Sequence, residues 1–393
     1  MNVEPLWKRK SQIVITCAKA IVPFLREEIL SLELPILSEG TSYVETEGTM
    51  EDAMRLNLFI RTGHRVLFLL KSFKARSPEG LYDKVSKMEW EEYLPEDEYL
   101  CVTSSVETPS IKDSRFANLK CKDAIVDRMK RVHGHRPDSG PERNRVVVHL
   151  YWKNEQCLLY FDTSGESLSK RGYRKITLKA PMQETLAAAV VLATGWNGEG
   201  NFVNPMCGSG TLATEAVLIG LNRAPGSLRN NFGFMHLKGF DESLWRALHK
   251  KAKGAAKRQL YGKIIVTDIS QEAVVSAEKN ATTAGVNHWM EFGRCDFSET
   301  PIPGREGVIV LNPEYGQRLG ETEKLKETYK KIGDFFKQKC KGYTGYIFTG
   351  NPDLAKRVGL RPKRRIPFFN GEIECRLLEY ELYEGSRKRP AQN

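Results

Sequence analysis

The stretch that most constrains the fold runs from Asn201 to Gly226, where a glycine turn separates an apolar strand from a helix. The strand is expected at residues 202–203 and the turn at residues 208–210, and the apolar positions that follow recur with helical spacing. Glycines at such a turn let the backbone approach a ligand, and the helix N-terminus offers unpaired N–H groups. The stretch therefore predicts a nucleotide-type cofactor site in an α/β domain, although a turn of this kind can also be purely structural.

Two other glycine motifs do not fit this turn. A phosphate-binding loop would need a lysine directly after Gly210, and none is present. In the dinucleotide pattern G-x-G-x-x-G, Ala213 stands where the third glycine would be. The turn must therefore be interpreted together with the motifs that follow it along the chain.

The charge balance points to an anionic partner. The 393 residues carry a formal net charge of +11, which is typical of proteins that bind nucleic acid. The 8 cysteines show no C-x-x-C spacing, which argues against a zinc site or a disulfide framework and favours a reducing cytoplasm. The N-terminus has no apolar signal core, and the chain has no run of about 18 apolar residues, so we expect neither a membrane span nor a metal.

The pattern of elements predicts several regions. Residues 1–75 alternate strand and helix as in a ferredoxin-like unit, and residues 76–165 form a second mixed unit. A basic linker is expected at 166–180. From 181 to 385, continuous apolar strands alternate with helices, which predicts a mostly parallel sheet with helices on both faces and a late antiparallel strand. Residues 386–393 form a basic tail.

Two basic segments are candidate nucleic-acid contacts. The helix expected at 118–133 has lysines and arginines on one side, which is either a phosphate-contacting surface or an ordinary solvated face. In the linker, Arg171, Arg174 and Lys175 flank Tyr173, and such a segment can grip single-stranded RNA by charge and stacking. An ordinary charged linker is an equally good interpretation.

Acidic residues follow two later strands. Asp268 ends the strand expected at 263–267, and Asp296 follows the short strand expected at 289–292. Because ligands bind beyond the carboxyl ends of parallel strands, Asp268 is expected to accept hydrogen bonds from ribose hydroxyls and Asp296 from an adenine amino group. The alternative for Asp268 is a helix N-cap, because a helix is expected directly after it.

The segment Asn312-Pro313-Glu314-Tyr315 follows a further buried strand and can carry a reaction. An amino group conjugated to a base is a poor nucleophile because its lone pair is delocalised. The Asn312 side chain and the Pro313 carbonyl can accept its two N–H bonds and turn the lone pair toward an electrophile, mainly by positioning and electrostatics. Tyr315 can stack on the base.

The motifs taken together resemble a known family. They are R-G-Y-R at 171–174, A-P-M-Q-E-T-L-A-A-A at 180–189, P-M-C-G-S-G-T-L at 205–212, R-A-P-G at 223–226 and N-P-x-Y at 312–315. They are similar to those of the bacterial 23S rRNA guanine-N2-methyltransferases that carry a THUMP RNA-binding domain. The resemblance implies a ferredoxin-like plus THUMP half and a Rossmann-like class I methyltransferase half.

The same resemblance implies a cofactor, a substrate and a set of site residues. The cofactor is S-adenosylmethionine, the substrate is RNA, and the methyl group goes to N2 of a guanine in 23S rRNA. Asp268 would hold the ribose, Asp296 the adenine, and Asn312, Pro313 and Tyr315 the target base. The methionine part would be held by Pro205, Cys207, Gly208, Ser209, Gly210 and Thr211.

The chain departs from the family pattern N-P-P-Y at one position, where Glu314 replaces the second proline. A proline there would restrict residue 313 to extended conformations, so the replacement loosens the loop. Our hypothesis is that the Glu314 carboxylate accepts from guanine N1–H; the alternative is that it points to solvent. Some members of the family carry a second methyltransferase domain, and a chain that ends at residue 393 is expected to perform one methylation.

Other functions stay open on the sequence alone. A tRNA guanine-N2-methyltransferase would have the same domains, whereas the basic N-terminal half argues against a DNA adenine enzyme. A protein from a different class, a catalytically silent THUMP RNA-binding protein, would account for Glu314 as the mark of a decayed site. The glycine turn and Asn312 are intact, which argues against decay.

Overall fold

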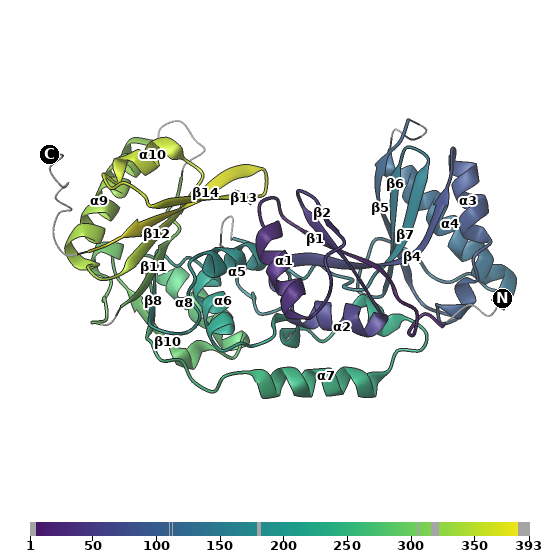
Figure 1. Ribbon diagram of the computed structural model, residues 1–393, viewed down its shortest axis with the longest axis horizontal. Helices are drawn as coiled ribbons and strands as arrows, with labels where there is room; N and C mark the ends of the chain where they lie inside the picture. Colours follow the sequence, from purple (N-terminus) through teal and green to yellow (C-terminus); the bar gives the residue numbers. More distant parts are fainter. Residues whose placement is uncertain are drawn as a thin grey trace. The chain divides into compact units, whose positions relative to one another are not determined.

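A computed structural model of the protein describes residues 5–109, 111, 113–178, 182–304, 306–315 and 322–383. The chain divides into a first unit of residues 1–171 and 224–254 and a second unit of residues 172–223 and 255–393. A seven-stranded sheet organises each of the two units (Figure 1). The expected tail at 386–393 and the expected helix start at Pro181 lie outside the described residues.

The first unit has one continuous sheet with the strand order β2-β3-β1-β4-β7-β6-β5. β4 (Gly63–Lys74) pairs with β1 (Ser11–Cys17) along one edge and with β7 (Gln156–Asp162) along the other. The ferredoxin-like and THUMP regions therefore share this strand. The other elements are β2 (Ser38–Glu39), β3 (Tyr43–Gly48), β5 (Leu100–Glu107), β6 (Val146–Lys153), α1 (Val22–Ser31), α2 (Met50–Phe59), α3 (Pro78–Ser86) and α4 (Ser114–His133).

Local sequence signals set where helices of this unit begin. Thr49 and Asp52 form the capping box expected at the start of α2, with the Thr49 N–H donating to Asp52 Oδ2 at 2.9 Å. The Asp113 side chain caps α4 by accepting from the Arg115 N–H at 2.9 Å. α4 therefore begins at Ser114, four residues before the start that apolar periodicity indicated.

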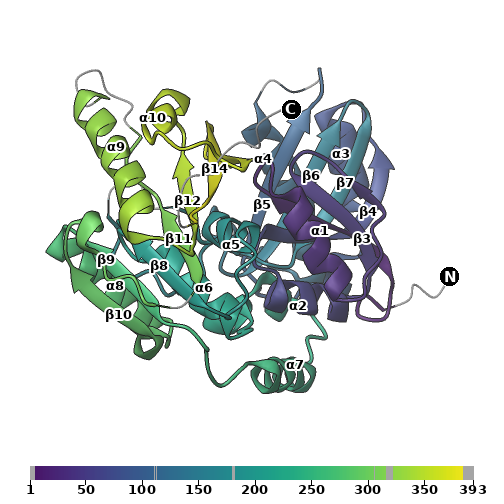
Figure 2. The ribbon, with the colours of Figure 1, turned by 60° about the vertical axis from the view of Figure 1, so that its left-hand side comes forward.

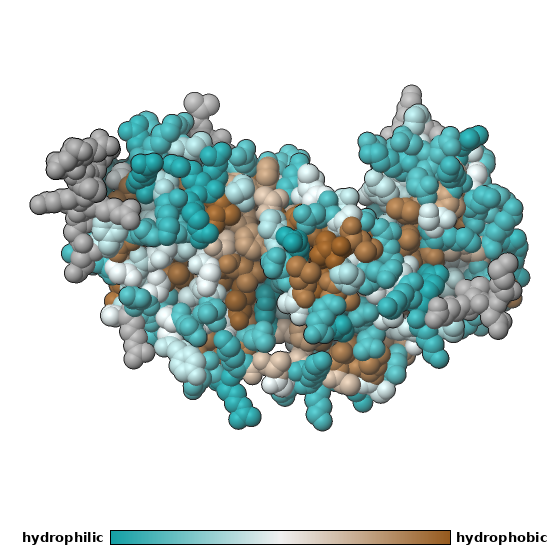
Figure 3. Space-filling model, in the orientation of Figure 1, coloured by the Kyte–Doolittle hydropathy of each residue, from teal (hydrophilic) through white to brown (hydrophobic). Residues whose placement is uncertain are grey.

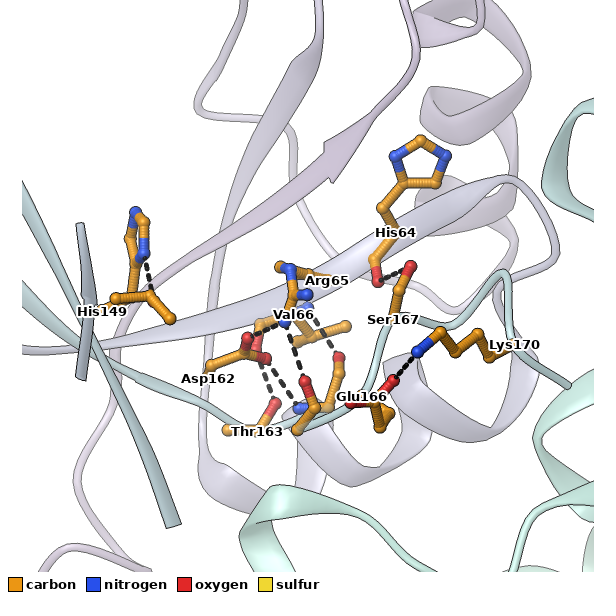
Figure 4. Close-up of polar contacts among 12 residues, drawn as sticks. His64, Arg65, Val66, His149, Asp162, Thr163, Glu166, Ser167 and Lys170 are labelled. Carbon is orange, nitrogen blue, oxygen red and sulfur yellow. Dashed lines mark hydrogen bonds and ion pairs between the residues drawn. The ribbon is translucent and has the colours of Figure 1, made fainter. Parts of the chain in front are cut away.

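The seam between β4 and β7 is a closed polar network (Figure 4). The Arg65 guanidinium pairs with the buried Asp162 carboxylate and also donates to the Gly165 carbonyl at 2.8 Å. Asp162 in turn accepts from the Ser164 N–H at 3.1 Å. Burial raises the pKa of Asp162 and Arg65 opposes that change. The network joins the last THUMP strand to the strand that it shares with the ferredoxin-like region.

Residues 224–254 pack into the first unit, although the sequence assigned them to the methyltransferase region at 181–385. Gly226 lies so close to α2 that a Cβ would stand 2.6 Å from the Asn57 carbonyl. The Phe234 N–H donates to the Thr163 carbonyl at 3.1 Å, and the Trp7 indole donates to the Lys238 carbonyl at 2.7 Å. Local sequence signals do not reveal these contacts, because they join residues far apart in the chain. The segment ends in α7 (Glu242–Ala255).

The second unit has the strand order β10-β9-β8-β11-β12-β14-β13. The first five strands are parallel, β14 runs antiparallel to β12, and β13 at the edge runs antiparallel to β14. This confirms the expected mostly parallel sheet with its late antiparallel strand. α9 covers one face, where it packs on Val203, Ile265 and Ile309 (Figure 2). The elements are β8 (Asn201–Pro205), β9 (Ile264–Asp268), β10 (Met290–Arg294), β11 (Gly307–Leu311), β12 (Thr344–Thr349), β13 (Arg364–Asn370), β14 (Ile373–Glu381), α5 (Glu184–Ala193), α6 (Thr211–Gly220), α8 (Gln271–Thr283), α9 (Thr322–Lys339) and α10 (Pro352–Arg357).

Candidate active site

The segments that carry the candidate site residues leave the same edge of the second sheet. β8 pairs in parallel with β9 on one side and with β11 on the other, and β9 pairs in parallel with β10. Their carboxyl ends therefore open together onto the glycine turn, Asp268, Asp296 and the segment 312–315. The parallel registry brings these four segments together as the sequence pattern predicted.

The glycine turn is held in the left-handed backbone region at three positions: Met206, Gly208 and Gly210 have φ of 57°, 53° and 78°. A Cβ on Gly210 would stand 2.7 Å from the Ala277 Cβ on α8, so glycine is required for packing. A Cβ on Gly208 would meet nothing within 4 Å. The turn is thus packed tightly against α8 on one side and open beside Gly208.

Asp268 holds the glycine turn in place. Its Oδ2 accepts from the Gly208 N–H at 3.0 Å, and its Oδ1 accepts from the Ser270 N–H at 2.9 Å. The N-cap of α8 is Ser270, whose hydroxyl accepts from the Ala273 N–H, so the alternative that Asp268 caps this helix was wrong. A carboxylate can accept about four hydrogen bonds, which leaves Asp268 capacity for ligand hydroxyls.

Asp296 lies exposed beyond β10. Its Oδ1 accepts from the Ser298 N–H at 2.9 Å and from the Ser298 hydroxyl at 2.7 Å, which starts a short 3-10 turn at Phe297–Glu299. This contact fixes the carboxylate at the sheet edge. An acceptor fixed there suits an amino group of a ligand, and that role stays a prediction.

Asn312 carries an acceptor that the fold leaves unused. Its Oδ1 is buried, and no donor among the described residues reaches it. Pro313 beside it is buried, whereas Glu314 is exposed. Burying an amide oxygen without a partner costs about 1–3 kcal/mol. A ligand that brings an N–H to Asn312 would recover this free energy.

Tyr315 is half-buried and held from two sides. Its hydroxyl accepts from Asn370 Nδ2 at 2.9 Å, and its carbonyl accepts from Asn351 Nδ2 at 3.3 Å. Its ring lies against Gly350, where a Cβ would come within 3.1 Å of the Tyr315 Cδ2. Burial raises the pKa of the Tyr315 phenol, which therefore stays neutral. Sequence reasoning missed both asparagines, although Asn351-Pro352 is a recognisable helix start.

Arg171 is a buried side chain, and not the exposed RNA contact expected for the basic linker. Its side chain is buried with 1% of the residue exposed, and its Nη2 donates to the Arg61 carbonyl at 2.6 Å. A buried guanidinium that already bonds backbone is a structural group. The residue belongs to the first unit.

Tyr173 is likewise buried, so the expected stacking of its ring on a base is wrong for this structure. Its hydroxyl donates to Glu215 Oε1 on α6 at 3.0 Å. Arg174 is partly buried and bonds the Thr211 hydroxyl at 3.1 Å and Glu184 at 3.3 Å. These side chains therefore pack across the start of α6 and are not free to bind RNA. We call residues 173–176 the strap.

Asn280, on α8, completes this strap and was not singled out from the sequence. Its Oδ1 accepts from the N–H groups of Lys175 and Ile176 at 2.9 Å and 3.2 Å. Its Nδ2 donates to the Ser209 carbonyl at 3.1 Å. The buried amide thus ties residues 175–176 directly to the glycine turn, while the Lys175 side chain stays exposed.

The part of the chain that the structure describes offers no candidate for a metal site or a membrane span. Among the described residues, no group of three or more His, Cys, Asp or Glu side chains is placed to hold a metal ion. Within the same residues, no helix has the length and apolar character needed to cross a membrane.

Comparison with protein families assigns three regions. The family described as "RMKL-like, methyltransferase domain" matches residues 171–379. A THUMP domain matches residues 75–162, and an "RlmL ferredoxin-like domain" matches residues 12–67. The methyltransferase match begins at Arg171, so it includes the strap that the sequence suggested was a linker.

Individual relatives cover most of the chain. "Putative RNA methyltransferase slr0064" of Synechocystis is 34% identical over 94% of this chain and 96% of its own length. "Ribosomal RNA large subunit methyltransferase K/L" of Syntrophotalea carbinolica is 36% identical over 94% of this chain, which spans 53% of that relative. The solved structure of SMU.472, "a putative methyltransferase complexed with SAH", is 29% identical with a TM-score of 0.84 and covers 97% of this chain and 100% of its own.

Proposed function

The chain belongs to the RMKL-like methyltransferase family with THUMP and RlmL ferredoxin-like domains, and on this premise we propose that it methylates the exocyclic N2 of a guanine in 23S rRNA. It is an S-adenosylmethionine-dependent methyltransferase with RNA as its partner. The K/L relatives support large-subunit rRNA as the substrate. The 8 cysteines are free thiols, which supports a cytoplasmic location.

The residues at the sheet edge fit this cofactor. The open side of Gly208 lets a ligand approach the backbone, and the first N–H groups of α6 have no side-chain cap. We assign the methionine part to the turn formed by Pro205, Cys207, Gly208, Ser209, Gly210 and Thr211. Asp268 would bind the ribose and Asp296 the adenine. When bound, the cofactor supplies an electrophilic methyl group on a sulfonium sulfur.

The unpartnered Asn312 Oδ1 is the observation that carries the proposal. A guanine amino group has two N–H bonds, and Asn312 Oδ1 together with the Pro313 carbonyl offers two acceptors for them. Holding both bonds turns the nitrogen lone pair away from the ring and toward the methyl donor. After transfer the nitrogen is cationic, and it loses one proton to water. Asn312 therefore orients the nucleophile and needs no strong base.

Two further residues are assigned to the base. Tyr315, fixed by Asn370 and Gly350, is placed to stack on one face of the guanine. Glu314 is exposed and lies next to the acceptor pair, and we assign its carboxylate to guanine N1–H. The Lys175 side chain is exposed and is assigned to RNA phosphate.

The test is methyl transfer from labelled S-adenosylmethionine to total RNA, followed by sizing of the RNA and nucleoside analysis. The proposal predicts N2-methylguanosine in the large rRNA. The same nucleoside in the tRNA fraction would identify a tRNA enzyme. If no RNA becomes labelled although the protein binds RNA, the protein is a catalytically silent RNA-binding protein.

A further inference from the structure

Lys250, Lys251 and Lys253 on α7 have no acidic partner among the described residues, and we propose that this face of the helix contacts the phosphate backbone of the RNA substrate. The inference rests on the proposed function, which makes RNA the substrate. It assigns RNA contact to the segment 224–254, which lies outside the THUMP match at 75–162. The segment falls within the methyltransferase match at 171–379 but contributes no strand to its sheet.

An aromatic cluster fixes α7 in one orientation. Trp245, Leu248 and Ala252 are buried and lie at helical spacing on one side. The Trp245 ring lies 5.4 Å from Phe232 and 5.0 Å from Phe234, between ring centroids, at steep angles. Because these contacts hold the apolar side inward, the opposite side of the helix is a fixed and exposed surface.

The outer surface of α7 carries the cations. Arg246, Lys250 and Lys253 are exposed at spacings of four and three residues, so they lie along one face, with Lys251 beside them. Figure 3 shows hydrophilic side chains beside apolar ones over the part of the view where Figure 1 labels α7. The face from Arg246 to Lys253 is about 10 Å long at 1.5 Å per residue, which matches roughly three phosphates along one strand.

Lys250, Lys251 and Lys253 form no ion pair with a described carboxylate. Glu242, the one acidic residue within α7, pairs with Arg246 at 2.7 Å. Among the described residues, no carboxylate lies within ion-pair distance of Lys250, Lys251 or Lys253. Phosphate would therefore meet these three ammonium groups without displacing an existing partner.

The basic helix that the sequence nominated, α4, differs in this respect. Arg115 pairs with Asp113 at 2.7 Å, Lys122 with Asp123 at 3.0 Å, and Arg128 with Glu91. Arg131 donates to the Ser86 carbonyl at 2.9 Å. Most cations of α4 thus already have partners within the protein, and RNA would have to compete for them.

The test measures affinity for purified 23S rRNA as a function of salt for wild type and for Lys250→Gln/Lys251→Gln/Lys253→Gln. The proposal predicts that affinity falls about tenfold or more and that the slope of log K against log salt falls by about 2, since each lost phosphate contact removes roughly 0.7–0.9. SAH affinity stays unchanged. The triple lysine-to-arginine variant, which keeps the charge, restores RNA binding.

A matched control removes the same charge from paired lysines outside the THUMP match and the basic linker, by Lys263→Gln/Lys339→Gln/Lys356→Gln; their partners are Glu291, Glu299 and Asp353. Equal losses in both triple variants would overturn the proposal, as would an unchanged salt slope for α7. Wild type that binds polyglutamate as tightly as 23S rRNA would reassign the face to an acidic protein. If wild type methylates RNA while the α7 variant binds it normally, the α7 proposal alone fails; if wild type methylates no RNA, the proposed function fails.

Discussion

Two regions of the molecule differ in whether their buried polar side chains are hydrogen-bonded. One is the carboxyl ends of β8 and β11, the sheet edge that carries the candidate site, and the other is the seam between β4 and β7. At the edge, the Oδ1 atoms of Asn204 and Asn312 are buried and meet no donor among the described residues. At the seam, Asn57 Nδ2 donates to Thr163 Oγ1 at 2.8 Å, and the Ser164 hydroxyl donates to Asn57 Oδ1 at 2.6 Å. The buried Asn57 side chain at the seam thus has hydrogen-bond partners for both its oxygen and its nitrogen, whereas the two asparagine oxygens at the sheet edge have none among the described residues.

This difference separates a scaffold from a site. A satisfied network rigidifies the region that contains it and gains nothing from a ligand. Unsatisfied acceptors beside an open glycine turn are costly until a ligand donates to them. Substitutions at the edge should therefore change cofactor binding and chemistry, and substitutions in the first unit should change stability or RNA affinity.

The largest effect on cofactor binding is expected from the glycine turn. Gly208→Ala adds a Cβ on the open side at a φ of 53°, which costs about 1 kcal/mol of strain and weakens SAH binding about tenfold or more. Gly210→Ala instead meets Ala277 and should lower the free energy of unfolding more than Gly208→Ala does. Calorimetry and urea unfolding measure both quantities. Equal SAH affinity in Gly208→Ala and wild type would contradict a cofactor at this turn.

A smaller effect is expected at the strap. Asn280→Ala leaves two N–H groups and the Ser209 carbonyl without their partner, which costs about 1–3 kcal/mol and should raise KM for S-adenosylmethionine about five- to tenfold. Asn280→Asp keeps the acceptor but loses the donor to the Ser209 carbonyl, so its KM for S-adenosylmethionine should lie between those of wild type and Asn280→Ala. Steady-state kinetics at saturating RNA separate KM from kcat. A fall in kcat with unchanged KM would show that the strap does not hold the turn.

A third effect is expected at Tyr315. Gly350→Ala places a methyl group against its ring and should lower kcat several-fold, by displacing a ring that the proposal stacks on the base. SAH affinity should not change, because the substitution lies away from the glycine turn. Tyr315→Phe keeps the ring, loses the hydroxyl contacts with Asn370 and Cys375, and is the milder control. Full activity in Gly350→Ala would contradict the stacking role.

A fourth effect concerns the stability of the first unit at low pH and leaves cofactor affinity unchanged. Burial lowers the pKa of His149 to about 4, with Arg65 and Arg143 contributing. Its unfolded-state pKa is about 6.5, so the unfolded chain binds the proton first, and stability falls as pH drops from 6.5 toward 4 by up to about 1.4 kcal/mol per pH unit. Urea unfolding at several pH values should show a shallower decline in His149→Gln. If the free energy of unfolding depends on pH in the same way in wild type and His149→Gln, His149 is not the group responsible. SAH affinity should be the same in both proteins.

Much of the second unit was predictable because its signals are local. The continuous apolar strands, the glycine turn and the N-P-x-Y segment each lie within a few residues, and parallel pairing then brings their ends to one edge. α10 was missed because six residues are too few to show helical periodicity. β13 was missed because Pro367 interrupts its pattern, which an edge strand tolerates.

The roles of the basic segments could not be read from composition. Arg171 and Tyr173 look like RNA contacts until their partners are known, and those partners lie 110 and 42 residues away. The basic residues of α4 and α7 look alike in sequence, and the carboxylate partners of Arg115, Lys122 and Arg128 on α4 become visible only in the structure. The placement of residues 224–254 depends on aromatic and backbone contacts of the same long-range kind.

Single-turnover methyl transfer by Asn312→Ala, at saturating S-adenosylmethionine and RNA, tests the central claim most directly. Loss of the buried acceptor should slow transfer about 100- to 1,000-fold, the range seen when one group that stabilises a transition state is removed. The affinities for SAH and for 23S rRNA should stay close to those of wild type. A rate equal to wild type, or a slow rate explained entirely by lost RNA or SAH binding, would contradict the assignment of the chemistry to this sheet edge.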